Sequence, residues 1–385
     1  MSKIQVISSF HERFNKAPDI VVCAPGRINL IGEHTDYNEG FVMPAAIDKS
    51  VWFAISPRTD QEIHLYAWNL QSYYQTTVSA LTKSTQLSWP NYILGTFDEL
   101  MKAGYQPGGV DVVFGGDIPN GAGLSSSAAV ESGMLFALNT LFEFGIPRTT
   151  LAQLAQKAEN NFVGMKCGIM DMFASLMGKT GHVFRLDCRN LHYEYFPVNF
   201  VEHTLLLCDS GVKHALVDSE YNTRRQECEA GVAIIQKKWP EVRNLRDVSK
   251  ELLESFKKDL HPVVFRRCKY VVEEIERVSK AGQAMQESRV GDLGALLYQT
   301  HTGLRDDFEV SCAEMDYLVA QTLQNSAIAG ARMMGGGFGG CTLNLIRRDA
   351  LESFQAEISA KYLATFDKML RCYPVELTDG VRVVG

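Results

Sequence analysis

The chain has 385 residues, of which 46% are hydrophobic and 22% charged, so it can bury a large core, and the usual size of domains predicts two of them. Its net charge of -7 at pH 7 argues against a general surface for nucleic acid or anionic membranes, because such surfaces need basic patches. The nine cysteines are scattered and form no Cys-x-x-Cys pair, and we find neither a signal peptide nor a run of about eighteen apolar residues. We therefore expect a cytoplasmic protein with reduced thiols.

The amino-terminal region predicts a helix, a strand and a polar segment. Residues 6–14 have the spacing of an amphipathic helix, and the β-branched run 19–24 is typical of a strand that ends at Pro25. The segment 24–37 then reads Ala-Pro-Gly-Arg-Ile-Asn-Leu-Ile-Gly-Glu-His-Thr-Asp-Tyr. On chemistry alone, this segment is either a polar surface loop whose arginine pairs with a carboxylate, or part of a functional site.

The next elements are predicted from alternation and turn signals. Residues 49–56 and 62–68 alternate as two paired strands joined by the turn 57–60. A helix begins after Trp89, and that tryptophan is more typical of a core or interface aromatic than of a ligand contact.

A glycine-rich turn over residues 115–129 lies between a strand predicted at 110–114 and a helix predicted at 130–144. Gly121 and Gly123 let the backbone approach a ligand, and the serines at 125–127 lie where the first amides of a helix have no internal partner. Such a helix start binds anions, and the hydroxyls add donors for phosphate or ligands for Mg²⁺. The Walker pattern is absent because no Gly-Lys-Ser/Thr follows the first glycines, and a plain helix cap is the alternative interpretation.

Two acidic residues stand out in the helices that follow. A helix capped by Thr149 or Thr150 carries Glu159 outside its apolar stripe, where a solvated side chain is the usual case. Asp171 lies in the apolar run 167–173, and an unpaired carboxylate is costly to bury there. A structural ion pair and a catalytic role are equally open for Asp171 on chemistry alone.

In the second half we expect strands at 182–187 and 204–209, with the first domain giving way to the second near residue 200. A charged helix opens within 213–225, and amphipathic helices fill most of 251–325, where we assign the acidic residues at 306–307 a structural role. The glycine-rich run 331–340 before a strand at 341–346 is by itself typical of a tight turn, and 381–384 predicts an edge strand.

Together these segments resemble the galactokinase family of the GHMP small-molecule kinases. Residues 26–37 match the galactokinase signature Gly-Arg-x-Asn-Leu-Ile-Gly-Glu-His-x-Asp-Tyr at every fixed position. Residues 119–129 match the second GHMP motif in its galactokinase form, and 331–340 fit the third. Further matches lie at 158–164, 167–171 and 219–225, and Met172 replaces the commoner Gln.

The resemblance implies an α+β fold of two domains with the active site between them. Residues 1–200 are expected to form an amino-terminal mixed β-sheet with helices, and residues 201–385 a carboxy-terminal split β-α-β domain. The implied reaction transfers the γ-phosphate of ATP to the C1 hydroxyl of α-D-galactose, with Mg²⁺ as the metal. We expect a monomer that binds neither nucleic acid nor membranes.

The resemblance also assigns roles to individual residues. Arg27, beside the transferred phosphoryl group, and Asp171, facing the hydroxyl, are implied to be catalytic. The implied sugar contacts are Glu33, His34, Thr35, Asp36, Gly168, Asp171 and Tyr221. The implied ATP contacts are Gly121, Ala122, Gly123, Leu124, Ser125, Ser126, Ser127 and, as a secondary candidate near the adenine, Trp89. Mg²⁺ is implied to be held by Ser127 and Glu159.

Two alternatives remain. A GHMP kinase could act instead on N-acetylgalactosamine, mevalonate or homoserine, although the cluster of Glu33, His34 and Asp36 disfavours the last two. A galactose sensor could bind ATP and sugar without turnover, although the intact run 125–128, together with Arg27 and Asp171, favours catalysis.

Overall fold

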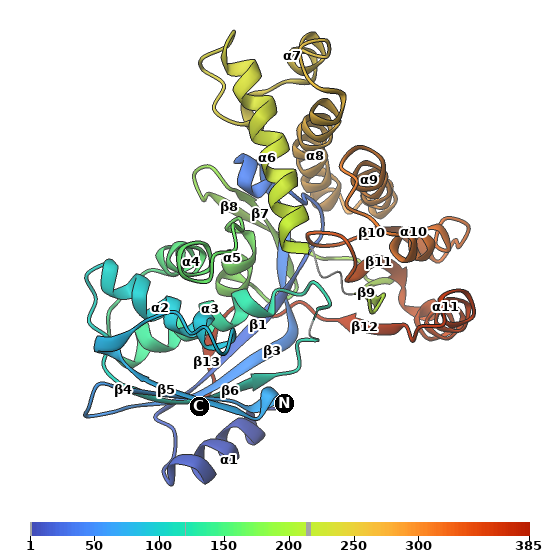
Figure 1. The fold of residues 1–385 in the computed structure, drawn as a ribbon. Coiled ribbons are helices and arrows are strands. Elements are labelled where there is room, and N and C mark those ends of the chain that lie inside the picture. The colour runs from blue at the N-terminus through green and yellow to red at the C-terminus, as the bar shows by residue number, and fades with distance from the viewer. Residues whose placement is uncertain (1, 120, 213–216) are drawn as a thin grey trace.

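The computed structural model describes residues 2–119, 121–212 and 217–385 (Figure 1). Asn120 of the glycine-rich turn and residues 213–216, where the charged segment begins, lie outside the described residues. The helices are α1 (Lys3–Phe14), α2 (Pro90–Lys102), α3 (Ser126–Leu141), α4 (Arg148–Lys157), α5 (Met170–Met177), α6 (Val217–Gln236), α7 (Lys250–Ser255), α8 (Pro262–Gln286), α9 (Val290–Thr302), α10 (Ala313–Ala320) and α11 (Leu351–Phe366). The strands are β1 (Ile20–Asn29), β2 (Phe41–Val42), β3 (Pro44–Pro57), β4 (Glu62–Ala67), β5 (Ser72–Thr77), β6 (Val110–Gly116), β7 (His182–Asp187), β8 (Tyr193–Pro197), β9 (His203–Asp209), β10 (Ile328–Met333), β11 (Cys341–Arg347), β12 (Arg371–Val375) and β13 (Arg382–Val383).

The first sheet is mixed and has helices on both faces. Its order is β13-β1-β3-β6-β4-β5, with β4 parallel to β6 and the other pairs antiparallel. Successive residues of a strand point to opposite faces, so Val21 packs with Phe10 of α1 while Val22 joins the core that includes Leu135 of α3. Figure 1 shows α1 below this sheet and α2 to α5 above it.

One predicted strand pairing is wrong. The strands at 49–56 and 62–68 do not pair with each other, because β6 lies between β3 and β4. Turn signals at 57–60 indicate that the chain reverses, but they do not say which strand becomes the neighbour. Residues 110–115 of β6 are all buried, and a strand that is buried along its length is typical of the centre of a sheet, where it has a partner on each side.

The first strand also runs further than predicted. β1 continues through Pro25 to Asn29, and its register against β3 shifts between Pro25 and Arg27. A bulge accommodates a proline, which cannot donate to the ladder. Arg27 therefore projects from a rigid strand rather than from a loop, and it is only 4% exposed.

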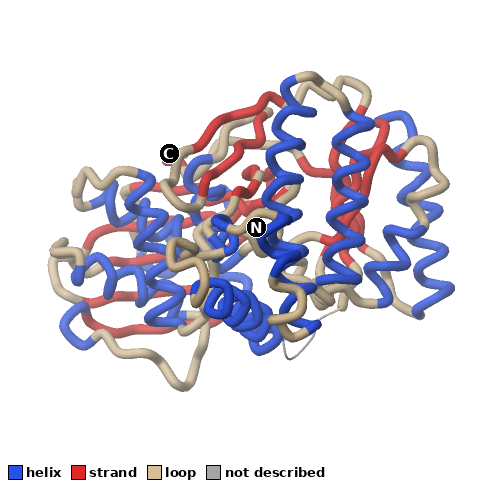
Figure 2. Tube along the Cα trace, turned by 90° about the horizontal axis from the view of Figure 1, so that it is seen from above, coloured by secondary structure: helices blue, strands red, loops and turns tan. Residues whose placement is uncertain are grey.

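The second half is built around another sheet, with the order β10-β11-β9-β12. Helices α9 to α11 lie beside it, as Figure 1 shows, while the short strands β2, β7 and β8 form a third sheet, against which α8 packs. The last strand, β13, returns to pair with β1 at the edge of the first sheet. Seen from above in Figure 2, helices and strands run through both halves of the molecule. In the part of the chain that the structure describes, no helix is long and apolar enough to cross a membrane.

Helix α9 lies unusually close to strand β10. A Cβ atom added at Gly294 would lie 1.8 Å from the carbonyl oxygen of Ala329, and one at Gly330 would lie 2.4 Å from the Cα of Gly294. Two glycines therefore let the helix and strand backbones touch. This contact fixes the position of β10, which carries Arg332 toward the site described below.

We predict that Gly294→Ala lowers the free energy of unfolding by about 1–3 kcal/mol or more, because the new methyl group must push α9 away from β10. Gly291→Ala on the same helix is the matched control, since no heavy atom lies within 4 Å of its added Cβ, and alanine favours a helix over glycine. Urea unfolding of both variants measures the difference. Equal stability of the two variants would contradict this account of the packing.

Candidate active site

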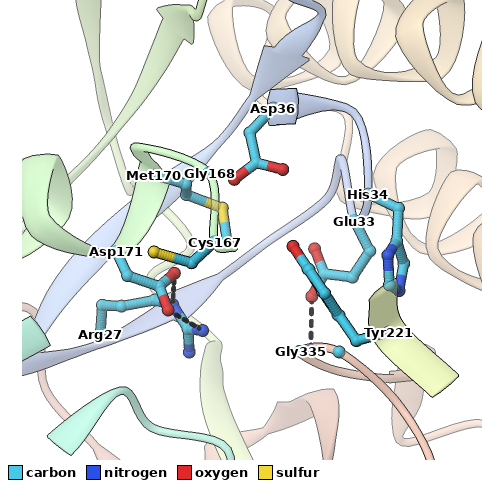
Figure 3. Close-up of a pocket in the computed structure, with 11 residues that line it drawn as sticks. Arg27, Glu33, His34, Asp36, Cys167, Gly168, Met170, Asp171, Tyr221 and Gly335 are labelled. Carbon is cyan, nitrogen blue, oxygen red and sulfur yellow. Dashed lines mark hydrogen bonds and ion pairs between the residues drawn. The ribbon is translucent and has the colours of Figure 1, made fainter. Parts of the chain in front are cut away.

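A polar pocket lies where β1, α5, α6 and the glycine-rich turn after β10 approach one another. With its opening to solvent, it comprises about 390 Å³ of empty space. Its lining residues are Arg27, Glu33, His34, Asp36, Cys167, Gly168, Met170, Asp171, Tyr221, Gly335 and Gly336. Figure 3 shows Arg27 and Asp171 on one side of this pocket and Glu33, His34 and Tyr221 on the other, with Asp36 at a third position. Carboxylates, imidazole and phenol are groups that hydrogen-bond to hydroxyls, so the pocket suits a small polyhydroxylated ligand.

Arg27 and Asp171 form a two-pronged ion pair. The Nε of Arg27 lies 2.7 Å from Oδ1 of Asp171, and its Nη2 lies 2.9 Å from Oδ2. The third guanidinium nitrogen, Nη1, donates to the carbonyl oxygen of Gly123 at 2.6 Å. A bidentate arginine fixes the plane of a carboxylate, so strand β1 determines how Asp171 on α5 faces the pocket (Figure 3). The same guanidinium also ties the glycine-rich turn before α3 to the pair.

Glu33 is held by a second buried arginine, Arg332 of β10. Neither side chain is more than 1% exposed, and Nη2 of Arg332 lies 3.0 Å from Oε1 of Glu33. The amide of Gly335 donates to the same oxygen at 2.7 Å, and Asn29 donates to Oε2. Arg332 also donates to the carbonyl oxygens of Leu30 and Met333 at 2.8 and 2.7 Å. Buried charges need such complete pairing, and here the pairing joins the first half of the chain to the second.

A cluster of aromatic side chains lies at one end of the pocket. The ring of His34 lies 5.3 Å from that of Tyr221 and 4.7 Å from that of Phe308, centroid to centroid. Its Nδ1 is 2.9 Å from the hydroxyl of Tyr37, while its Nε2 is buried without a hydrogen-bond partner among the described residues. Burial, helped by the positive charge of Arg224, lowers the pKa of His34 to about 3. The imidazole is therefore neutral at physiological pH, with one nitrogen available to a ligand.

Asp36 packs directly against the backbone of Gly168. A Cβ atom added at Gly168 would lie 1.7 Å from Oδ2 of Asp36, so any larger residue would displace the carboxylate. Burial and the neighbouring Asp171 raise the pKa of Asp36 to about 6. Two carboxylates facing one small pocket repel each other, and a ligand that donates hydrogen bonds to both relieves this repulsion.

The glycine-rich turn leads into the amino terminus of α3. Gly121, Gly123 and Ser125 adopt left-handed backbone angles, with φ of 79°, 72° and 57°. The helix that follows has no acidic residue in its first turn, and its first amides have no partner within the helix. The amide dipoles of α3 thus present a positive end where an anion can bind.

A second, more apolar cavity adjoins this helix start and, with its opening to solvent, comprises about 920 Å³. Trp89, Tyr92 and Phe114 line it together with Ser126 and Ser127. Trp89 lies 5.6 Å from Phe114, ring to ring, and its Nε1 donates to Ser72 at 3.1 Å. A cavity lined by both aromatic rings and hydroxyls suits a ligand with a flat ring and an anionic end.

Glu159 is the second residue of a π-helical turn, Ala158–Val163, and is 3% exposed. Its Oε2 accepts a hydrogen bond from the thiol of Cys167 at 3.2 Å. Because Cys167 lines the polar pocket, Glu159 lies one residue behind the pocket wall. Burial and the nearby Glu159 raise the pKa of Glu131 well above its ordinary value. Within residues 2–119, 121–212 and 217–385, no three His, Cys, Asp or Glu side chains converge as a metal site made by the protein alone.

The structure brings most of the predicted site residues together, with some differences. Thr35 is fully buried, and its hydroxyl donates to the carbonyls of Gly32 and Phe41, so it braces the turn instead of facing the pocket. The helix expected to be capped by Thr149 or Thr150 has Pro147 as its cap residue. Sequence reasoning missed Arg332, although an arginine between apolar residues just before a glycine run was a signal that a buried charge needed a partner.

Comparisons with known proteins identify relatives of this chain. Family models match in three places: the galactokinase galactose-binding signature over residues 8–57, the GHMP kinases N terminal domain over 91–179, and the GHMP kinases C terminal over 281–364. The galactokinase of Roseiflexus sp. (strain RS-1) is 38% identical over 97% of this chain and 95% of its own length. The galactokinase of Thermotoga neapolitana is 40% identical over 94% and 99%.

A solved structure gives the same result. The crystal structure of Lactococcus lactis galactokinase complexed with galactose superposes with a TM-score of 0.95 at 31% identity, covering 98% of each chain. The predicted α+β GHMP kinase fold with two domains is thereby confirmed.

The raised pKa of Asp36 generates a prediction about pH. The folded protein binds this proton more tightly than the unfolded chain, so between about pH 4 and 6 the contribution of Asp36 to the free energy of unfolding falls as pH rises, by up to about 3 kcal/mol. Asp36→Asn should therefore be more stable than the wild type at pH 7.5, and the difference should shrink toward pH 4. Urea unfolding at a series of pH values measures it. A difference that stays constant across this range would contradict the prediction.

Proposed function

This chain belongs to the galactokinase family of the GHMP kinases and is an ATP-dependent sugar kinase, and from that premise we propose how its residues carry out the reaction. The observation that carries the proposal is the Arg27–Asp171 ion pair, which lines the polar pocket and contacts the glycine-rich turn before α3. In this proposal galactose occupies the polar pocket and ATP occupies the cavity beside Trp89.

The sugar is recognised by hydrogen-bonding groups that line the pocket. The buried Nε2 of His34 pairs with a sugar hydroxyl, the carboxylate of Asp36 accepts from another, and Glu33 offers the acceptor position that Asn29 leaves on its Oε2. Tyr221 closes the aromatic side. A site built to pair with hydroxyls rejects ligands that lack them, because its own polar groups would stay buried and unpaired.

ATP is placed with its base near Trp89 and its phosphates toward the amino terminus of α3. The aromatic lining of the second cavity supports the position of the adenine, and Ser126 and Ser127 at the start of α3, which also line it, support that of the phosphates. The turn over 121–125 wraps the phosphates by its backbone amides, as the left-handed glycines allow. This arrangement directs the γ-phosphoryl group at Arg27 and Asp171.

Phosphoryl transfer depends on positioning and on neutralising charge more than on covalent chemistry. Asp171 orients the C1 hydroxyl of galactose and accepts its proton. A carboxylate is a much weaker base than an alkoxide, so we place the proton transfer late, as the bond to phosphorus forms. Arg27 stabilises the charge on the γ-phosphoryl oxygens and holds Asp171 in place.

Ser127 and Glu159 are the residues that would hold Mg²⁺. Both offer oxygen ligands, which this ion prefers, and Mg²⁺ usually needs only one or two protein ligands because phosphates and waters complete its shell. The buried Glu159 near Glu131 supports a cation here, since two carboxylates in a dry place favour a positive charge. When bound, Mg²⁺ neutralises the β- and γ-phosphate oxygens.

We also place the enzyme in the cytoplasm as a monomer. Its nine free thiols support a reducing compartment.

ADP release tests the proposed substrate. We expect rapid release with ATP, Mg²⁺ and galactose, and little or none with glucose, N-acetylgalactosamine, mevalonate or homoserine. Asp171→Asn is the matched control: it should abolish turnover while ATP still binds, because the amide keeps the shape of the carboxylate but cannot take the proton. Galactose binding without turnover of any compound would make the protein a sensor, and turnover of another compound would overturn the assigned sugar contacts.

The metal assignment has its own test. Replacing Glu159 by Gln should raise the Mg²⁺ concentration needed for half-maximal activity by about tenfold or more, since a charged ligand is lost. Binding of Mn²⁺ together with ATP, followed by electron paramagnetic resonance, should weaken in parallel. An unchanged metal response in both measurements would move the ligand elsewhere.

A further inference from the structure

Ser125 holds a backbone conformation that suits glycine better than serine. Its φ of 57° and ψ of 53° are left-handed, a region that is unfavourable for residues with a Cβ. The same turn uses Gly121 and Gly123 at its other left-handed positions. An unfavourable conformation at a functional site persists only where surrounding contacts hold it, so the side chain of Ser125 needs an explanation.

The hydroxyl of Ser125 does not perform the usual task of a serine at this position. Ser125 is the cap residue of α3, yet its side chain accepts no hydrogen bond from the first amides of the helix. Instead, its Oγ donates to Oδ2 of Asp171 at 2.5 Å. A hydroxyl this close to a carboxylate makes a strong, charge-assisted hydrogen bond. The left-handed backbone thus points the hydroxyl at the proposed catalytic carboxylate.

This contact changes how many positions on Asp171 remain for the sugar. A carboxylate has about four acceptor positions, two on each oxygen. Arg27 occupies one on Oδ1 and one on Oδ2, and Ser125 occupies the second on Oδ2. Only Oδ1 then keeps a position for a further donor.

We propose that Ser125 is a positioning residue that directs Oδ1 of Asp171 to receive the proton of the sugar hydroxyl. The inference rests on the proposed role of Asp171 as the proton acceptor. In the step, the hydroxyl oxygen forms a bond to the γ-phosphorus, and its proton moves to Oδ1. The bond from phosphorus to the bridging oxygen breaks, and its electron pair leaves with ADP. Ser125 and Arg27 keep their contacts to Asp171 throughout, so the carboxylate cannot turn its other oxygen toward the substrate.

Ser125→Gly tests this proposal because it removes the hydroxyl and relieves the backbone at the same time. We expect kcat to fall about tenfold or more, since misplacing a reacting group is costly, while KM for galactose and the affinity for ATP change by less than about twofold. Thermal stability should stay the same or rise. Ser125→Ala, which keeps the left-handed backbone without the hydroxyl, should lose kcat to a similar extent without the gain in stability.

Glu143→Gly is the matched control for the backbone effect. Glu143 is an exposed residue after the other end of α3, with φ of 53°, and it lies outside the pocket. This variant should gain stability without any change in kcat. A similar gain in stability in both glycine variants, with a reduced kcat only in Ser125→Gly, supports the proposal.

Other results would overturn the proposal. A rise in KM for ATP with unchanged kcat would make Ser125 a phosphate contact, and unchanged kinetics in both Ser125 variants would remove any role of the hydroxyl. A large loss of stability in Ser125→Gly would show that the serine is structural. Because every comparison is made with the wild type, absence of galactose turnover in the wild type itself would instead refute the proposed function.

Discussion

The ion pair of Arg27 with Asp171 is the interaction on which the geometry of the site depends. It joins three elements that are distant in sequence: β1, the turn before α3, and α5. Arg27 is almost fully buried, so its charge requires a partner, and Asp171 provides one while keeping part of its surface open to the pocket. The same guanidinium holds the carbonyl of Gly123, which places the glycine-rich turn against the polar pocket. One buried charge thereby sets both the direction of the carboxylate and its position relative to the turn.

The second half of the chain is tied to this centre by Arg332. Its contacts with Glu33 and with the carbonyls of Leu30 and Met333 fix the segment that carries Glu33 against β10. The glycines after β10 lie against the turn before α3, and Gly335 and Gly340 have φ of 87° and 82°, a left-handed region that favours glycine. The position of β10 in turn depends on its backbone contact with α9. Packing far from the pocket is therefore part of how the pocket keeps its shape.

Local signals in the sequence predicted most of the elements and the general location of the site. Apolar runs and glycine-rich turns identified β6, α3 and the turn between them, because these patterns reflect burial and backbone freedom within a few residues. Strand pairing was beyond such signals, as the insertion of β6 between β3 and β4 shows. The partners of Ser125 and Arg332 were also out of reach, since Asp171 and Glu33 lie 46 and 299 residues away in the chain. The residue types predicted which side chains belong to the candidate site, whereas only the fold shows which of their atoms form hydrogen bonds and ion pairs.

The central claim is that Asp171 and Arg27 act on one particular hydroxyl of the sugar, the one at C1. Phosphorus and proton nuclear magnetic resonance of the product formed from ATP and galactose tests this most directly. The account predicts a single sugar phosphate whose phosphorus couples to the anomeric proton, with the α configuration. Coupling to protons of any other carbon, or a mixture of positions, would contradict the proposed orientation of galactose in the pocket.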